Sequence, residues 1–265
     1  MKKGLLSLAV VLLLVQCSKV PLTGRKQMKF VPTSQMASMS ATQYEQVKTE
    51  TPPLPDSDPR TQMVKKVGAK IAASVNKYLS ENGFKDRVDD FNWEFNVVDQ
   101  PIVNAWCMPG GKVMFYTGIL DICQGEDGIA TVMGHEIAHA VARHGNERMS
   151  QQLIVQGGGM ALSVMMSEKP QMAQDLLMSA VGAGSQLGIL KFSRMNESEG
   201  DQMGLVFMAM AGYDPGVAVD FWKRMAAGKS GEAPPEFMST HPSDERRIAD
   251  IQAYLPEARK YMPSK

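Results

Sequence analysis

Three of the chain's four histidines stand at positions 135, 139 and 144, close together in the sequence. They lie in or just after a run of small and apolar residues, Gly128 to Ala142, which favours a buried helix. Residues four apart on a helix project from nearly the same face, so His135 and His139 can bind one ion. The rest of the chain must therefore fold around a buried helix that carries two imidazoles on one face.

The pattern His135-Glu136-x-x-His139 is typical of zinc hydrolases. Glu136 lies about 100° around the helix from His135, which places its carboxylate beside the metal without making it a ligand. Zinc lowers the pKa of a bound water towards about 7, and a carboxylate base then makes that water a nucleophile. Two histidines satisfied inside a core helix are the alternative. The motif favours a zinc site with Glu136 as the general base.

A catalytic zinc site also needs a third protein ligand, with one position left open for water. In the metzincin pattern this ligand would fall at position 145 of this chain, which is Gly145. Glycine has no ligand atom, so the third ligand must lie elsewhere. The sequence 193–201 offers two candidates, Glu197 and Glu199.

Helix geometry distinguishes the two glutamates, because a zinc-bound imidazole usually donates its second N–H to a carboxylate. One turn after Glu197 lies Asp201, which can accept that bond, whereas one turn after Glu199 lies Met203. We therefore predict that Glu197 binds zinc, that Asp201 supports a histidine, and that Glu199 is solvated or ion-paired. An acidic helix start without a metal is the alternative.

Two strands are predicted ahead of the histidine helix. Residues 91–97 alternate between apolar and polar side chains, and residues 111–117 form the second predicted strand. Between them, the sequence Asn104-Ala105-Trp106 precedes Pro109 and two glycines, a composition that suits the edge of a sheet. Such an edge can bind an extended peptide as an added strand, or it can simply turn a corner.

The other predicted elements are helical. Asp58 suits an N-cap and Pro59 the first position of a helix. Residues 146–192 predict a helical hairpin beside the site, interrupted at the glycines 157–159 and at Lys169-Pro170, with contact to a membrane surface as the alternative. The remaining helices are predicted at 119–123, at 215–225 with Asp214 as its N-cap, and at 243–255, with a flexible loop at 228–235.

The sequence 135–144, together with the spacing Glu197-x-x-x-Asp201, resembles peptidase family M48, a family of zinc metallopeptidases. The resemblance extends from about residue 58 to residue 251. It implies an α+β, mainly helical, zincin-like fold with a small β-sheet packed on the active-site helix. It also implies that the edge at Asn104, Ala105 and Trp106 binds the substrate.

The same family pattern has a late His-Pro followed by an arginine, which this chain has at His241-Pro242. By resemblance, His241 lies near the zinc, where it stabilises the transition state or caps the open position at rest. Arg247 matches the family arginine better than Arg246 does. No chemistry requires Arg143 or His144, and we expect both to make contacts on the helix surface.

The N-terminus has the features of an export signal, since two lysines precede an apolar run too short to span a bilayer. Leu14-Val15-Gln16-Cys17 resembles a bacterial lipobox, in which Cys17 becomes the lipid-bearing first residue. Gln16 departs from the usual small residue, and ordinary signal cleavage nearby is the alternative. We predict a signal at 1–17, an irregular tether or arm at 18–57, and a metallopeptidase domain at 58–265.

Charge and cysteine content narrow the possible partners. Lysine plus arginine and aspartate plus glutamate both number 28, so nothing indicates a nucleic-acid partner. Cys107 and Cys123 do not make a disulfide framework, and we expect two buried free thiols.

The sequence thus predicts a zinc-dependent endopeptidase with one Zn²⁺ per chain. Resemblance to exported family members implies that it cleaves unfolded or misfolded envelope proteins in the bacterial periplasm, attached to the membrane only through the lipid at Cys17. A zinc-stabilised chaperone or assembly factor of the envelope is the alternative, although it would not need Glu136. An intramembrane protease is disfavoured, because no apolar run approaches about 20 residues.

Overall fold

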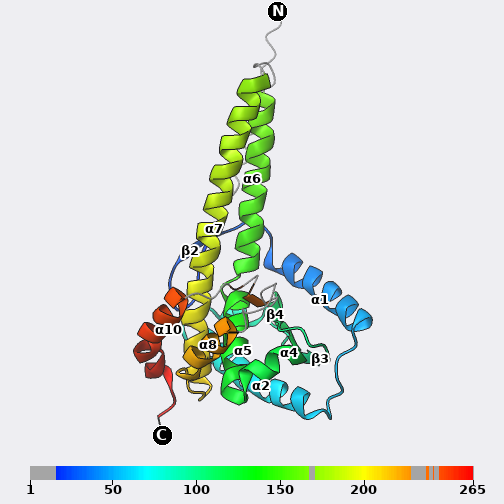
Figure 1. Ribbon diagram of the computed structural model, residues 1–265, viewed down its shortest axis with the longest axis vertical. Helices are drawn as coiled ribbons and strands as arrows, with labels where there is room; N and C mark the ends of the chain where they lie inside the picture. Colours follow the sequence, from blue (N-terminus) through cyan, green and yellow to red (C-terminus); the bar gives the residue numbers. More distant parts are fainter. Residues whose placement is uncertain (1–15, 167–170, 228–236, 239–240, 242–244, 265) are drawn as a thin grey trace, which may run out of the picture.

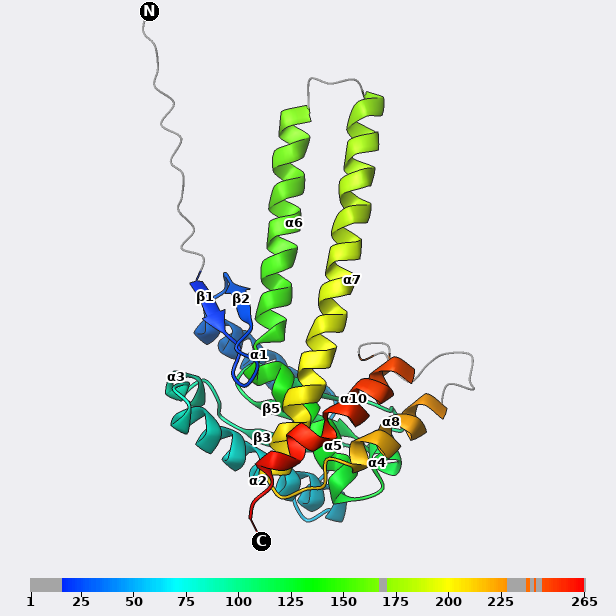
Figure 2. The same cartoon turned by 90° about the vertical axis from the view of Figure 1, so that its left-hand side faces the viewer.

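The structure, a computed structural model, describes residues 16–166, 171–227, 237–238, 241 and 245–264. Helices form most of a compact body, and two long antiparallel helices project from it (Figures 1 and 2). The body contains a three-stranded sheet, and a two-stranded hairpin lies near the base of the projection. The predicted α+β, mainly helical, zincin-like fold is confirmed.

Strands and helices are interspersed along the first half of the chain, and the elements described in the second half are helical. The strands are β1 (Gln16–Lys19), β2 (Lys26–Lys29), β3 (Glu94–Val98), β4 (Ala105–Met108) and β5 (Lys112–Tyr116). The helices are α1 (Thr33–Glu50), α2 (Pro59–Glu81), α3 (Lys85–Val88), α4 (Thr117–Cys123), α5 (Glu126–Val141), α6 (His144–Met166), α7 (Gln171–Met210), α8 (Val217–Ala227) and α10 (Glu245–Ala258), followed by the 3-10 turn η2 (Arg259–Tyr261).

Helix α5, which carries the histidine motif, lies at the centre of the body and is almost entirely buried. Helix α7 crosses α5 at a point where both helices have glycines. A Cβ on Gly134 would stand 2.6 Å from the carbonyl oxygen of Gly204, and one on Gly200 would stand 2.9 Å from Nε2 of His139. The glycines therefore let α7 approach closely enough to bring its acidic residues to the histidines.

The three-stranded sheet has the order β3-β5-β4. Strand β3 runs parallel to β5, and β4 runs antiparallel to it. The turn between β4 and β5 contains Gly110 and Gly111, with φ angles of 87° and 81° that favour glycine. Among the strands that the structure describes, β4 pairs only with β5. The predicted edge strand is therefore confirmed, with Asn104 directly before it.

Residues 18–57 were predicted to be irregular, and this prediction was wrong for much of the segment. Strands β1 and β2 form an antiparallel hairpin, and α1 is a helix of 18 residues. Tyr44 fixes α1 to the sheet, because its fully buried hydroxyl donates to the carbonyl oxygen of Val113 at 3.0 Å. A helix of weak local preference can thus form where tertiary packing stabilises it. The boundaries at 17/18 and 57/58 stay predictions, and residues 1–15 lie outside the described residues.

Helices α6 and α7 form the predicted helical hairpin, but the glycines at 157–159 do not interrupt it. They lie inside α6, so the predicted break was wrong. Each glycine costs a helix about 1 kcal/mol relative to alanine, and α6 nevertheless continues through all three. The second predicted break, Lys169-Pro170, lies outside the described residues. Within those residues, no helix combines the length and apolar character needed to cross a membrane.

The remaining helices largely agree with those predicted from the sequence. Asp58 caps α2 by accepting a hydrogen bond from the backbone N–H of Arg60, as predicted. Helix α8 begins at Val217, two residues later than predicted, because Asp214 instead accepts from the N–H of Gly216 in the turn before it. The predicted loop at 228–235 lies outside the described residues.

Candidate metal centre

Four side chains from three parts of the chain converge in the body. His135 and His139 come from α5, Glu197 from α7, and His241 from the segment before α10; one ligand atom of each lies within 4.8 Å of the others. His135 Nε2 lies 3.0 Å from His139 Nε2 and 3.0 Å from His241 Nδ1. Glu197 Oε2 lies 2.8 Å from His241 Nδ1. The structure thus brings together the three predicted ligands and adds His241 as a fourth donor.

This donor set fits a single metal ion. Ligand atoms at about 2.0–2.1 Å from a tetrahedral zinc lie roughly 3.3 Å apart. Glu197 Oε2 is 3.4 Å from His135 Nε2, and Glu197 Oε1 is 3.5 Å from His139 Nε2. Glu197 Oε1 is also buried without a hydrogen-bond donor in the described part of the chain. A cation between these atoms would satisfy the carboxylate and both imidazoles together.

Asp201 lies behind His135, as the sequence predicted, with Oδ1 3.0 Å from His135 Nδ1. Arg247 donates from Nε and Nη2 to the two oxygens of Asp201, each at 2.8 Å. Its guanidinium also stacks 3.6 Å from the ring centroid of Trp222. Arg247 therefore lies behind the cluster and holds the carboxylate that faces His135.

These carboxylates change the proton affinity of His135. Burial lowers its pKa, but Asp201 and Glu197 outweigh this effect and raise the pKa to about 9. Burial and the neighbouring His135 instead hold the pKa of His139 well below its ordinary value. The two imidazoles of the motif thus differ in charge at neutral pH when no metal is bound.

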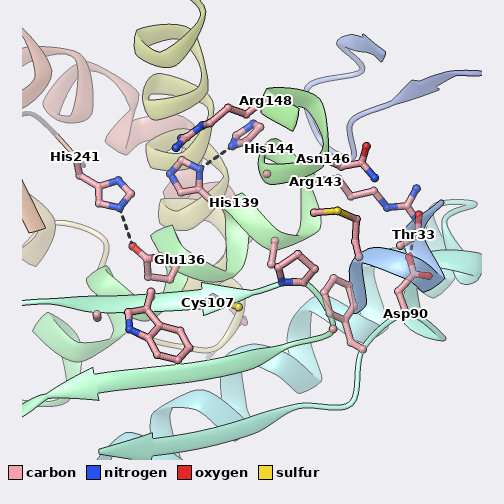
Figure 3. Close-up of a pocket in the computed structure, with 18 of the residues that line it drawn as sticks. Thr33, Asp90, Cys107, Glu136, His139, Arg143, His144, Asn146, Arg148 and His241 are labelled. Atoms are coloured by element: carbon pink, nitrogen blue, oxygen red, sulfur yellow. Dashed lines mark hydrogen bonds and ion pairs between the residues drawn. The ribbon is translucent and has the colours of Figure 1, made fainter. Parts of the chain in front are cut away.

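His139 contacts His144, which the sequence predicted to make contacts only on the helix surface. His144 Nδ1 lies 2.8 Å from His139 Nδ1, and His144 is 1% exposed, so that prediction was wrong (Figure 3). Arg143 adopts a left-handed φ of 57° between α5 and α6, and this turn returns His144 towards α5. A non-glycine residue rarely adopts this conformation, so no local pattern predicts the contact.

Glu136 stands beside the cluster, with Oε1 3.4 Å from His241 Nε2 (Figure 3). Burial raises the pKa of Glu136 above the ordinary carboxyl value, although His241 and His135 oppose this. A carboxylate with a raised pKa accepts protons more readily near neutral pH. Glu136 is therefore suited to the proton transfer that the motif predicts.

A cleft of about 320 Å³ opens over Glu136, His139 and His241. The edge strand β4 forms one side of it, and the start of α6 lies on the other (Figure 3). The predicted substrate-binding residues Asn104, Ala105 and Trp106 all line the cleft, as does Cys107. Both cysteines are free thiols in the structure; Cys123 is buried as predicted, whereas Cys107 is only half-buried.

Comparison with known proteins agrees with this geometry. The model of peptidase family M48 matches residues 65–255. The mitochondrial metalloendopeptidase OMA1 of Schizosaccharomyces pombe is 35% identical over 91% of this chain and 67% of its own length. OMA1 of Saccharomyces cerevisiae is 31% identical over 91% of this chain and 70% of its own length. A putative beta-barrel assembly-enhancing protease of Vibrio cholerae is 33% identical over 62% of this chain, but over 34% of its own length. These relatives support a metalloendopeptidase, and the chain belongs to peptidase family M48.

Proposed function

We propose that the protein is a zinc-dependent endopeptidase, with His135, His139 and Glu197 as the ligands of one Zn²⁺ and Glu136 as the general base. One observation carries the proposal: ligand atoms from α5 and α7 converge beside the Glu136 carboxylate, at the base of a cleft. A zinc ion bound there supplies Lewis-acid activation of water and of the scissile carbonyl.

Strand β4 gives the substrate a place to bind. An extended peptide would pair with the open edge at Ala105 and Trp106, with Asn104 at the start of the strand. Backbone pairing of this kind accepts many sequences, because it uses the peptide groups that all substrates share. The peptide would then lie along the cleft that contains Glu136.

The side chains around the peptide would carry the proton transfers. Glu136 takes a proton from the attacking water and passes it to the leaving amine. His241 donates an N–H to the oxyanion as negative charge develops. When no substrate is present, the same ring would bind the zinc as a further ligand, and the contact of His241 Nδ1 with Glu197 Oε2 at 2.8 Å supports this role. Arg247 keeps His135 in place through Asp201.

We further propose that the protein acts in quality control of the bacterial envelope, on unfolded or misfolded proteins in the periplasm. The signal-like N-terminus, the lipobox-like Cys17 and the similarity to a protease named for beta-barrel assembly support this location. Unfolded chains suit an edge strand, since their backbone hydrogen-bonding groups are free. Labelling with a radioactive fatty acid, compared with a Cys17→Ser variant, tests the anchor.

The decisive experiment measures hydrolysis of casein by the full, zinc-loaded chain beside a Glu136→Gln variant of equal zinc content. We expect the variant to lose activity by a factor of about 10²–10⁴, because it lacks the general base. Glu126→Gln, in the first turn of the same helix and ion-paired with Lys66, is the matched control and should cleave normally. Equal cleavage by wild type and Glu136→Gln would contradict the role of Glu136.

If none of these zinc-loaded proteins cleaves casein, the next protein to test is a His241→Ala variant. If His241→Ala then cleaves casein, the imidazole caps the metal at rest and the proposed enzyme stands. If His241→Ala is also inactive while zinc stays bound, capping by the imidazole does not explain the lack of cleavage, and a zinc-stabilised chaperone or assembly factor is then favoured over the endopeptidase.

A further inference from the structure

The loop between β1 and β2 reaches the back of the metal centre. Arg25 donates from Nε and Nη2 to Oε2 of Glu199 on α7, at 2.9 and 2.7 Å. Thr23 donates its hydroxyl to the other oxygen of Glu199 at 2.5 Å. Arg25 also donates from Nη1 and Nη2 to the two oxygens of Glu147 on α6, at 2.9 and 2.8 Å. One guanidinium from the N-terminal segment thus joins two buried carboxylates on different helices.

Glu199 connects this arginine to a zinc ligand. His144 Nε2 lies 2.9 Å from Glu199 Oε2, and His144 Nδ1 lies 2.8 Å from His139 Nδ1. A carboxylate can only accept, so the proton of His144 is held on Nε2 and its Nδ1 carries a lone pair. That lone pair accepts from Nδ1–H of His139, and His139 Nε2 is left with its lone pair directed at the metal site.

The same hairpin also supports the end of the histidine helix. Gln27 donates from Nε2 to the carbonyl oxygen of Ala142 at 2.7 Å, and Arg87 donates to the carbonyl oxygen of Val141 at 2.5 Å. Arg87 in turn donates to the carbonyl oxygen of Lys19 in β1 at 2.5 Å. The last carbonyls of a helix have no partner within it, so these bonds satisfy groups that would otherwise be unpaired. The hairpin therefore fixes both the end of α5 and the ring of His139.

We propose that the β1–β2 hairpin, residues 16–29, belongs to the metal centre, and that Arg25 is a positioning residue for His139 through Glu199 and His144. The proposal rests on the proposed zinc site. It extends that site to a segment outside the 65–255 region that the family model matches. Zinc affinity should therefore depend on a residue far from every ligand in the sequence.

The test compares zinc affinity of the full wild-type chain with that of Arg25→Met, measured by competition with a chromophoric chelator. We expect Arg25→Met to bind zinc roughly 10–100-fold more weakly, the usual effect of losing a group that orients a ligand. Lys26→Met changes the adjacent, exposed residue and should bind like wild type. Arg25→Lys should recover only part of the affinity, because an ammonium cannot bridge two carboxylates as a guanidinium does.

A second readout and a second variant separate positioning from folding. Cobalt substituted for zinc reports ligand geometry through its visible absorption, which should change in Arg25→Met and stay unchanged in Lys26→Met. His144→Phe keeps the Arg25–Glu199 contact but breaks the link to His139, so its zinc affinity should also decrease. This variant tests the inference if Arg25→Met does not fold. Thermal unfolding of the metal-free proteins identifies the folded variants.

The outcomes distinguish this inference from the function on which it rests. Wild-type affinity and an unchanged cobalt spectrum in a folded Arg25→Met or His144→Phe variant would overturn the inference and leave the zinc site standing. A wild-type chain that binds neither metal would overturn the proposed function, and the inference with it.

Discussion

The two imidazoles of the motif are one helical turn apart, yet the chain supports them differently. Behind His135 lies a carboxylate in direct contact, Asp201 at 3.0 Å. Arg247, from the C-terminal helix α10, holds that carboxylate. The support of His135 thus consists of a buried ion pair from the C-terminal part of the chain.

Behind His139 lies a second imidazole, His144, and only then a carboxylate, Glu199. Arg25, from the N-terminal hairpin, holds that carboxylate. The two carboxylates both come from α7, whereas the two arginines come from opposite ends of the chain. The difference between the two sides is therefore the neutral ring that separates His139 from the negative charge.

This difference shows how one site can orient two imidazoles while a carboxylate lies directly behind the Nδ1 atom of only one of them. Direct contact with Asp201 strengthens the proton affinity of His135, whereas the intervening ring orients His139 and leaves its pKa low. A bound metal then competes with a proton at one imidazole and not at the other. The two supports should therefore fail in different ways when they are changed.

The largest effect is expected from Asp201→Asn, which breaks the direct support. Arg247 would be left as a buried charge without its main partner, and such a loss lowers the free energy of unfolding by about 3–5 kcal/mol. Urea unfolding of the metal-free protein should show this decrease, and zinc affinity should fall roughly 10–100-fold. Asp250→Asn, which changes an exposed ion pair with Arg246, should lower the free energy of unfolding by less than about 1 kcal/mol. Equal stability of Asp201→Asn and wild type would show that the ion pair does not support His135.

The second expected effect is a proton released on zinc binding. A protonated His135 cannot bind a metal, and its pKa of about 9 keeps it protonated at pH 7.5. Zinc affinity should therefore fall up to about tenfold for each pH unit below 9, with the loss growing as the pH decreases. Calorimetric titration in buffers of different ionisation enthalpy should count about one proton at pH 7.5, and fewer in Asp201→Asn. A binding enthalpy independent of the buffer would contradict the raised pKa.

The two sides also differ in how far the sequence predicted them. Glu197 and Asp201 were predictable because residues four apart share a helix face, and that rule depends only on local spacing. Arg25 and Glu199 are 174 positions apart, and nothing local to either residue indicates the other. A contact of this kind depends on the whole fold, which brings the N-terminal hairpin against α7.

The error at residues 18–57 has the same origin. Proline and polar residues at 18–57 indicate a weak local preference for regular structure, yet packing of Tyr44 against the sheet holds α1 in place. Local preference predicted the elements that it alone decides, such as the start of α2 at Asp58. It did not predict those that distant contacts stabilise.

The smallest expected effect concerns the stability of the His139 side in acid. Burial raises the pKa of Glu199, but His144, Arg25 and Thr23 outweigh this effect and lower it from 4.5 to about 2. Its contribution to stability is complete above about pH 4.5, because the carboxylate is then ionised in both the folded and the unfolded chain. As the pH falls below 4.5 the unfolded chain takes up the proton first, so the contribution decreases and is lost below about pH 2.

Glu199→Gln isolates this contribution, since glutamine has no proton to gain. The difference in free energy of unfolding between wild type and the variant, both metal-free, should shrink by about 1 kcal/mol between pH 5 and pH 3.5. Urea unfolding at the two pH values measures it. Carboxyl groups that share no partner with Glu199 contribute similarly to both proteins and cancel in the difference. A difference that does not change with pH would mean that Glu199 has an ordinary pKa, and that Arg25 and His144 hold it less firmly than Arg247 holds Asp201.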